Sequence, residues 1–278
     1  MTQSDIGIVG LGVMGANLAL NLSDKDFRLS VYNRTSAVTA EFIETHGQGR
    51  AILMADSLQQ LVSQLGSPRV ILMMVTAGGA VEAVIEQLQP LLEAGDILID
   101  GGNSNYQDTD RRWRELATKN IYFVGMGVSG GEDGARFGPS LMPGGAAAAW
   151  PGIRDMFQAI AARVDGVPCC QWLGDGGAGH YVKMIHNGIE YGDMQLIAEV
   201  CHLMQHALGL SHDEMADCFA VWNGGRLESY LVEITARILG SAIATVAPWL
   251  MRFSIKRGKK ARACGRHRMR STTPSRSP

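Results

Sequence analysis

Ile6-Gly-Ile-Val-Gly-Leu-Gly-Val-Met-Gly15 decides the fold class of this chain. Its first four residues have the pattern of a short buried strand, and a helical pattern occupies residues 17–22 directly after the glycines. The glycines at 10, 12 and 15 have the G-x-G-x-x-G spacing, which allows a tight turn and lets backbone N–H groups meet a pyrophosphate at the helix N-terminus. The stretch predicts a dinucleotide site, with an ordinary glycine-rich turn as the alternative.

Apolar runs recur along the first half of the chain, separated by stretches with helical spacing. The runs lie at residues 29–32, 70–75, 97–99 and 122–124, and the helical stretches include residues 57–65 and 80–92. Strands that alternate with helices predict an α/β fold, here an N-terminal Rossmann-like, doubly wound parallel sheet.

A glycine-dense segment at residues 174–179 predicts a domain boundary. Residues 180–208 contain no proline and no turn dipeptide, so they predict one helix of about 28 residues. Ser211, followed by Asp213 and Glu214, predicts the N-cap of another helix. We therefore predict a nucleotide-binding domain at 1–176 and an incomplete all-helical domain at 177–239.

The charge of the chain is divided unevenly. The whole sequence has 25 basic and 27 acidic residues, yet residues 240–278 contain ten Lys and Arg and no acid. Glycine, serine, threonine and proline replace the helical pattern there, which predicts a basic, disordered low-complexity tail.

Composition excludes several classes of protein. With 46% hydrophobic and 19% charged residues, the chain is typical of a globular protein, and its longest apolar run is too short to cross a bilayer. The first residues include Asp5 and no basic segment, so we expect no secretory signal and a cytoplasmic location. Five cysteines without a C-x-x-C spacing predict reduced thiols and neither a disulfide framework nor a zinc site.

The second predicted strand is followed by Asn33, Arg34 and Thr35. An acid at this place would bind the ribose 2′-hydroxyl of NAD, and none is present. The planar guanidinium of Arg34 suits a 2′-phosphate instead. The sequence favours NADP, with an arginine in solvent as the alternative.

Two further loops follow predicted strands, where open α/β sheets bind ligands. Asp100-Gly-Gly-Asn103 comes after the strand at 97–99, and Gly127-Val-Ser-Gly-Gly131 comes after the strand at 122–124. Both are candidate ligand loops, and an ordinary turn is the alternative for each.

One stripe of the long helix has side chains that can transfer protons. Lys183, His186, Asn187 and Glu190 are spaced to lie along two turns of one helix side. A lysine base with an acid nearby suits acid and base catalysis, whereas a polar surface stripe without a role is the alternative.

Six segments together resemble the 6-phosphogluconate dehydrogenase family over residues 6–239. They are Gly10-Leu-Gly-Val-Met-Gly15, Asn33-Arg-Thr35, Asp100-Gly-Gly-Asn103, Gly127-Val-Ser-Gly-Gly131, Gly138-Pro-Ser-Leu-Met-Pro-Gly-Gly145 and Gly179-His-Tyr-Val-Lys-Met-Ile-His-Asn-Gly-Ile-Glu-Tyr-Gly-Asp-Met-Gln195. The last segment is long and highly specific.

The resemblance implies oxidative decarboxylation of 6-phosphogluconate with NADP⁺, a pentose phosphate pathway step in gluconate utilization that needs no metal. It implies a homodimer, with Lys183 as general base and Glu190 as general acid. The residues that it assigns to substrate are Asn103, Ser129, Gly130, Gly131, His186, Asn187 and Tyr191. Those that it assigns to the cofactor are Gly10, Leu11, Gly12, Val13, Met14, Gly15, Asn33, Arg34, Thr35, Val75, Thr76, Ala77 and Asn103.

The chain departs from the family pattern in three respects. Most members have alanine where Gly12 stands and lysine where Thr76 stands, and members continue well beyond this chain. The absent part includes a Lys-Gly-Thr segment and an arginine and a histidine that reach the sugar phosphate from the partner subunit. We expect a truncated or frame-shifted product in which residues 240–278 are not family sequence, with poor solubility and weak or absent turnover.

Two other functions remain open. Another β-hydroxyacid dehydrogenase would share the glycine loops and the helix lysine, although Glu190 and the run from His186 to Tyr191 argue against it. A non-catalytic NADP-binding fragment is the second. Ten cations without interleaved aromatic residues would give only nonspecific, salt-sensitive contact with nucleic acid, so we expect no nucleic-acid or membrane partner.

Overall fold

The computed structural model describes residues 3–241 and divides the chain into two compact units, residues 1–187 and 188–278. This division lies inside one long helix, after Asn187. Nearly all of the predicted basic tail lies outside the described residues.

A seven-stranded sheet forms the centre of the first unit. Its order is β3-β2-β1-β4-β5-β6-β7, in which every pairing is parallel except the antiparallel pair β6–β7. The strands are β1 (Ile6–Val9), β2 (Leu29–Tyr32), β3 (Ile52–Met54), β4 (Val70–Met73), β5 (Ile97–Asp100), β6 (Tyr122–Ser129) and β7 (Ser140–Gly145). The predicted doubly wound sheet is confirmed, with one antiparallel edge strand added.

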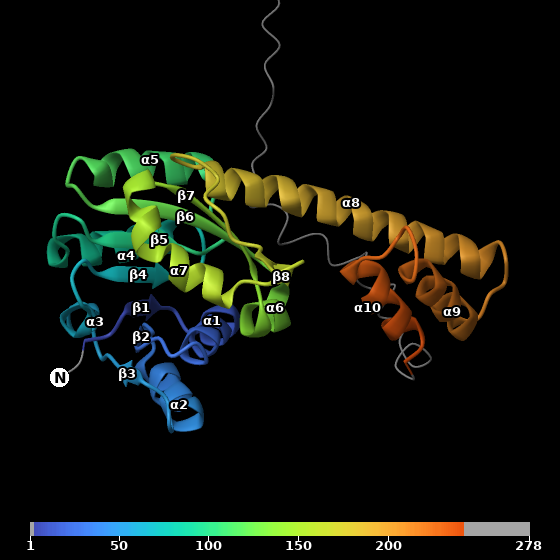
Figure 1. Ribbon diagram of the computed structural model, residues 1–278, viewed down its shortest axis with the longest axis horizontal. Helices are drawn as coiled ribbons and strands as arrows, with labels where there is room; N and C mark the ends of the chain where they lie inside the picture. Colours follow the sequence, from blue (N-terminus) through green and yellow to red (C-terminus); the bar gives the residue numbers. More distant parts are fainter. Residues whose placement is uncertain (1–2, 242–278) are drawn as a thin grey trace, which may run out of the picture. The chain divides into compact units, whose positions relative to one another are not determined.

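Helices cover both faces of this sheet (Figure 1). Apolar side chains of α1 (Val13–Ser23), α2 (Ser36–His46), α6 (Gly131–Phe137) and α7 (Trp150–Ile160) form a core with one face. Those of α3 (Leu58–Gln64), α4 (Gly79–Leu88) and α5 (Tyr106–Ala117) form a core with the other face. Short 3₁₀ turns at Gln89–Leu91 and Ala147–Ala149 and a small hairpin of β8 (Arg163–Val164) and β9 (Val167–Pro168) complete the unit.

The observed elements differ from the predicted ones at a few boundaries. β4 ends at Met73, so Val75 lies in the following loop, and β6 continues through Gly127 to Ser129. Two strands of the seven-stranded sheet, β3 and β7, were not predicted, nor was the β8–β9 hairpin. β3 has only three residues, and β7 contains Pro143 and two glycines, which are uncommon in strands and tolerated here because β7 is at the sheet edge.

The second unit is helical. The predicted long helix is confirmed as α8 (Ala178–His206), which has 29 residues. Ser211 begins α9 (His212–Asn223) in a reciprocal capping box with Glu214, as predicted, and α10 (Tyr230–Leu239) follows. None of the helices within residues 3–241 combines the length and the hydropathy of a bilayer span.

Candidate active site and cofactor loops

The glycine turn after β1 has no room for side chains at two of its three glycines. Gly10 has φ +102°, and a Cβ there would lie 2.4 Å from the Met74 carbonyl oxygen. A Cβ at Gly15 would lie 2.0 Å from the Gly10 carbonyl oxygen. Gly12 has an ordinary φ of −66° and open space within 4 Å, so an alanine fits there without strain.

This turn leads directly into the N-terminus of α1. The first α1 hydrogen bond runs from the Ala16 N–H to the Gly12 carbonyl oxygen, so the preceding N–H groups of Val13, Met14 and Gly15 have no acceptor within the helix. Such groups, together with the helix dipole, attract anions. The turn can therefore receive a pyrophosphate.

The loops after β1 and β4 meet where the strand order reverses. From β1 the chain builds β2 and β3 toward one edge of the sheet and then returns to β4 on the other side of β1. Ligands of open α/β sheets bind at such a switch point. Thr76 and Ala77 are exposed in the loop after β4, whereas Val75 is partly buried against the core.

The end of β2 is joined to the glycine turn by Asn33. Its Oδ1 accepts a 3.1 Å hydrogen bond from the Leu11 N–H, and its own N–H donates to Thr39 Oγ1 at 3.0 Å. Arg34 and Thr35 are exposed at the start of α2, whose first turn carries no acid. The structure thus places these predicted cofactor residues beside the glycine turn.

The loop after β5 is shaped by a buried carboxylate. Asp100, at the end of β5, accepts hydrogen bonds from the Gly102 N–H at 3.0 Å and from Ser104 Oγ at 2.6 Å. A Cβ at Gly102 would lie 3.0 Å from the Val75 carbonyl oxygen, so this loop abuts the loop after β4. Asn103 is exposed and lies between Gly102 and Ser104, the two residues that donate hydrogen bonds to Asp100.

The start of α8 packs against the end of β6. Lys183 is only 7% exposed, and a Cβ at Gly127 would lie 2.4 Å from Lys183 Cβ, so the glycine makes room for the lysine. Ser129 Oγ lies 3.3 Å from His186 Nε2, and His186 Nδ1 lies 3.4 Å from Asn187 Oδ1. The structure therefore brings Lys183, His186, Asn187 and Ser129 to one end of β6.

The residues after Ser129 form a glycine turn within the first unit. Gly130 has φ +122° and caps α6, and Gly131 has φ +63°. Both values favour glycine, so this backbone can approach a ligand closely. We expected the turn to begin near residue 127, but Gly127 is inside β6.

Glu190 and Tyr191 lie further along α8, in the second unit. Glu190 follows Lys183 by two turns of this helix, and Tyr191 is 68% exposed. Their roles toward a substrate stay predictions.

Sequence reasoning missed a buried polar network beneath these loops. Arg112, on α5, is 1% exposed and donates to Glu82 and Asp100, and Thr109 Oγ1 lies 2.6 Å from His180 Nδ1. Burial lowers the pKa of His180, although the nearby Asp100 charge opposes that effect. An arginine among other charged residues of α5 gives no sequence signal for burial, because most such arginines are on the surface.

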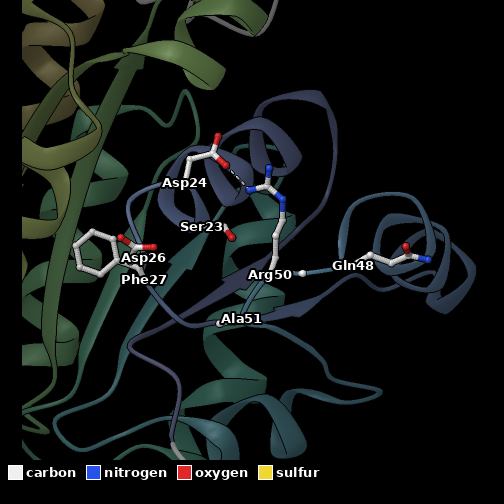
Figure 2. A pocket seen from close by; sticks show the side chains of 8 residues that line it. Ser23, Asp24, Asp26, Phe27, Gln48, Arg50 and Ala51 are labelled. Carbon is white, nitrogen blue, oxygen red and sulfur yellow. Dashed lines mark hydrogen bonds and ion pairs between the residues drawn. The ribbon is translucent and has the colours of Figure 1, made fainter.

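A pocket elsewhere in the first unit contains none of the predicted site residues (Figure 2). It lies between the end of α1 and the segments that lead into β2 and β3, and the Asp24 carboxylate pairs there with Arg50. These segments are at the amino ends of the strands, whereas the candidate site is at their carboxyl ends. No group of three or more His, Cys, Asp or Glu side chains in the described part of the chain could hold a metal ion.

Comparison with known families finds two models that match consecutive parts of the chain. The family model for the NAD binding domain of 6-phosphogluconate dehydrogenase matches residues 5–174. The chain belongs to the 6-phosphogluconate dehydrogenase family. The model for the C-terminal domain of 6-phosphogluconate dehydrogenase matches residues 179–253, so the family match continues beyond Leu239, where we expected it to end.

Individual 6-phosphogluconate dehydrogenases agree with this assignment. The decarboxylating enzyme of Drosophila simulans is 59% identical over 237 residues, which cover 85% of this chain and 49% of that protein. A solved structure of the Plasmodium falciparum enzyme, studied in its apo form and in complexes with NADP⁺ and 6-phosphogluconate, matches with a TM-score of 0.82 and 43% identity over 85% of this chain and 51% of that chain. The chain spans about half the length of these relatives.

A more distant structure has the same fold. Mycobacterium tuberculosis 3-hydroxyisobutyrate dehydrogenase has a TM-score of 0.67 and 21% identity over 83% of this chain and 74% of that chain. At this identity the likeness shows the fold alone.

Proposed function

We propose that the chain takes part in the NADP⁺-dependent oxidative decarboxylation of 6-phosphogluconate to ribulose 5-phosphate and CO₂. The observation that carries the proposal is that buried Lys183 packs against Gly127 of β6, two residues before Ser129, whose Oγ lies 3.3 Å from His186 Nε2. The same unit contains the glycine turn after β1. The complexes of the Plasmodium falciparum relative with NADP⁺ and 6-phosphogluconate support the same pair of ligands. We place this step in the pentose phosphate pathway and in the cytoplasm.

NADP⁺ fits the residues at the switch point. The pyrophosphate would lie on the N–H groups of Val13 to Gly15, where any side chain at Gly10 or Gly15 would collide with backbone. The adenosine 2′-phosphate would meet Arg34 at the end of β2, where a carboxylate would repel it. Residues of the loops after β4 and β5, among them Thr76, Ala77 and Asn103, would hold the nicotinamide half. When bound, the nicotinamide ring accepts a hydride.

Lys183 begins the reaction as a neutral amine. Its Nζ takes the proton of the substrate's C3 hydroxyl while the hydride leaves C3, which produces a 3-keto acid. The lysine ammonium then donates a hydrogen bond to the C3 carbonyl oxygen and stabilises the negative charge that develops there as the C1–C2 bond breaks and CO₂ leaves. Lys183 is suited to this role, because it is only 7% exposed and its Cβ and Cγ pack against Gly127 near the end of β6.

Glu190 completes the reaction as general acid. It delivers a proton to the carbon that lost CO₂, which becomes C1 of ribulose 5-phosphate. The substrate hydroxyl and carboxylate groups are held by polar side chains and by open backbone at the two glycines. These residues are Asn103, Ser129, Gly130, Gly131, His186, Asn187 and Tyr191.

The length of the relatives bears on turnover. Because they are about twice as long, groups beyond this chain can contribute to their substrate site. We therefore propose that this chain binds NADP⁺ with its own residues and catalyses the full reaction slowly or not at all.

An absorbance assay for NADPH tests the proposal. The purified chain is incubated with NADP⁺ and either 6-phosphogluconate or 3-hydroxyisobutyrate, with Lys183→Met as the control. Any NADPH that forms should require 6-phosphogluconate and Lys183. NADPH formation with 3-hydroxyisobutyrate but not with 6-phosphogluconate would contradict the proposed substrate. NADP⁺ binding without turnover of either substrate would contradict the proposed reaction and favour the alternative of a non-catalytic NADP-binding chain.

A further inference from the structure

Arg112 lies below the loops that follow β4 and β5. It is on α5 and only 1% exposed, so its guanidinium is removed from water. Its Nε and Nη2 donate to Glu82 Oε1 at 3.0 and 2.9 Å, and its Nη1 donates to Asp100 Oδ2 at 3.3 Å. One side chain therefore joins two elements that are separate in the sequence.

The Glu82 end of this bridge fixes the cofactor loop after β4. Glu82 is in the first turn of α4, and its N–H donates to the carbonyl oxygen of Gly78. Gly78 ends the segment of Thr76 and Ala77 and has φ +92°. The position of Glu82 therefore determines where this loop ends and α4 begins.

The Asp100 end fixes the loop that carries Asn103. The same carboxylate that accepts from Arg112 also accepts from the Gly102 N–H and from Ser104 Oγ. The two loops are in direct contact, since a Cβ at Gly101 would lie 2.5 Å from Met74 Sδ. Arg112 thus connects the loops after β4 and β5 through Glu82 and Asp100, and the two loops also contact each other directly.

We propose that Arg112 is a positioning residue that holds these two loops at a fixed separation and thereby sets the affinity for the nicotinamide half of NADP⁺ without contacting the cofactor. The inference rests on the proposed NADP⁺ function. A planar guanidinium reaches two carboxylates at once with directed hydrogen bonds, whereas the single ammonium of lysine does not reproduce that fork. The adenosine half binds around Arg34 and the glycine turn, away from this bridge.

The test uses two ligands that share the adenosine half. NADP⁺ and adenosine 2′,5′-bisphosphate, which lacks the nicotinamide, are titrated into the wild-type chain and into Glu82→Gln and Arg112→Lys variants. Glu82→Gln is the milder change because the Glu82 side chain is 33% exposed. Glu115→Gln is the matched control, since it removes only the exposed pair of Glu115 with Arg111 and leaves the bonds from Arg111 and Arg112 to Glu82 in place. Circular dichroism verifies that each variant is folded.

We expect Glu82→Gln and Arg112→Lys to weaken NADP⁺ binding by about three- to thirtyfold while the affinity for adenosine 2′,5′-bisphosphate changes less than about twofold. Glu115→Gln should bind both ligands as the wild type does. Equal weakening of both ligands, or no weakening in the folded variants, would overturn the positioning role. A wild-type chain that binds neither ligand would overturn the NADP⁺ function itself, and this inference with it.

Discussion

The two compact units bury their apolar side chains to very different extents. In the first unit, helices and strands form a continuous core on each face of the sheet. In the described part of the second unit, the core consists of five buried residues, Met204, Met215, Phe219, Val232 and Leu239. Burial of apolar surface is the dominant favourable contribution to folding, so the first unit contains most of the stabilising interactions.

The long helix shows this difference within a single element. In its first turns His180 and Lys183 are buried, whereas further along Ile189, Leu196 and Leu203 are each about 60% exposed. Because nothing in residues 3–241 covers this apolar side of α8, it contributes little to the stability of the described part. Among the described residues, apolar burial therefore stabilises the first unit far more than the second.

The largest expected effect distinguishes two leucines that both lie in helices. Leu18, in α1, is 0% exposed, and Leu203, in α8, is 60% exposed. Leu18→Ala should lower the free energy of unfolding by about 2–5 kcal/mol, because it leaves a cavity in the core. Leu203→Ala should change it by less than about 0.5 kcal/mol. Urea unfolding measures both, and equal losses would show that α8 is as well packed as α1.

The next largest expected effect is on the affinity of the chain for NADP⁺. Arg34→Asp should weaken NADP⁺ binding by about ten- to hundredfold, because a charge-assisted hydrogen bond is lost and a like charge faces the 2′-phosphate. NAD⁺, which has no such phosphate, should bind nearly as before. Calorimetric titration of both cofactors measures the change. If both affinities fell by the same factor, the 2′-phosphate assignment would be wrong.

Replacement by alanine should change stability and NADP⁺ binding at one glycine of the turn and not at another. Gly15→Ala forces a Cβ against the Gly10 carbonyl oxygen and should cost about 1–3 kcal/mol of stability. It should also weaken NADP⁺ binding. Gly12→Ala is the matched control, because its Cβ enters open space with an unstrained backbone. Thermal unfolding with and without NADP⁺ measures both effects, and a Gly12→Ala loss as large as that of Gly15→Ala would refute the steric argument.

The smallest expected effect is the pH dependence of stability that His180, in the first turn of α8, contributes. Because burial lowers the pKa of His180 below its usual 6.5, the unfolded state binds a proton that the folded state does not. Stability should therefore rise with pH through this window and be lost as pH falls below about 6.5, by at most about 1.4 kcal/mol per pH unit. The lowered pKa values of Glu82 and Asp5 act at more acidic pH.

The urea concentration at the midpoint of unfolding, determined between about pH 7 and pH 5, measures this loss of stability. The His180→Gln variant retains a polar group for Thr109 and has no titrating ring, so its midpoint should depend less on pH. Identical pH profiles for the variant and the wild type would show that another group controls the acid-side loss.

The sequence predicted five of the seven strands of the sheet and the glycine turn after β1, because their signals are local. The glycine spacing from Gly10 to Gly15 and the apolar runs at β1, β2 and β5 each depend on residues within one element. The edge strand β7 was missed because Pro143 and its glycines contradict strand propensity, and only pairing with β6 stabilises the strand. The bridge made by Arg112 was missed because its partners lie 12 and 30 positions away in sequence. Such contacts exist only after the fold has formed.

The central claim is that the first unit binds NADP⁺ with its own residues, although the chain spans about half the length of its relatives. Calorimetric titration of the purified chain with NADP⁺ and NAD⁺ tests this claim most directly. The account predicts one NADP⁺ bound per chain and much weaker binding of NAD⁺. Absence of NADP⁺ binding to the folded chain, or equal affinity for the two cofactors, would contradict it.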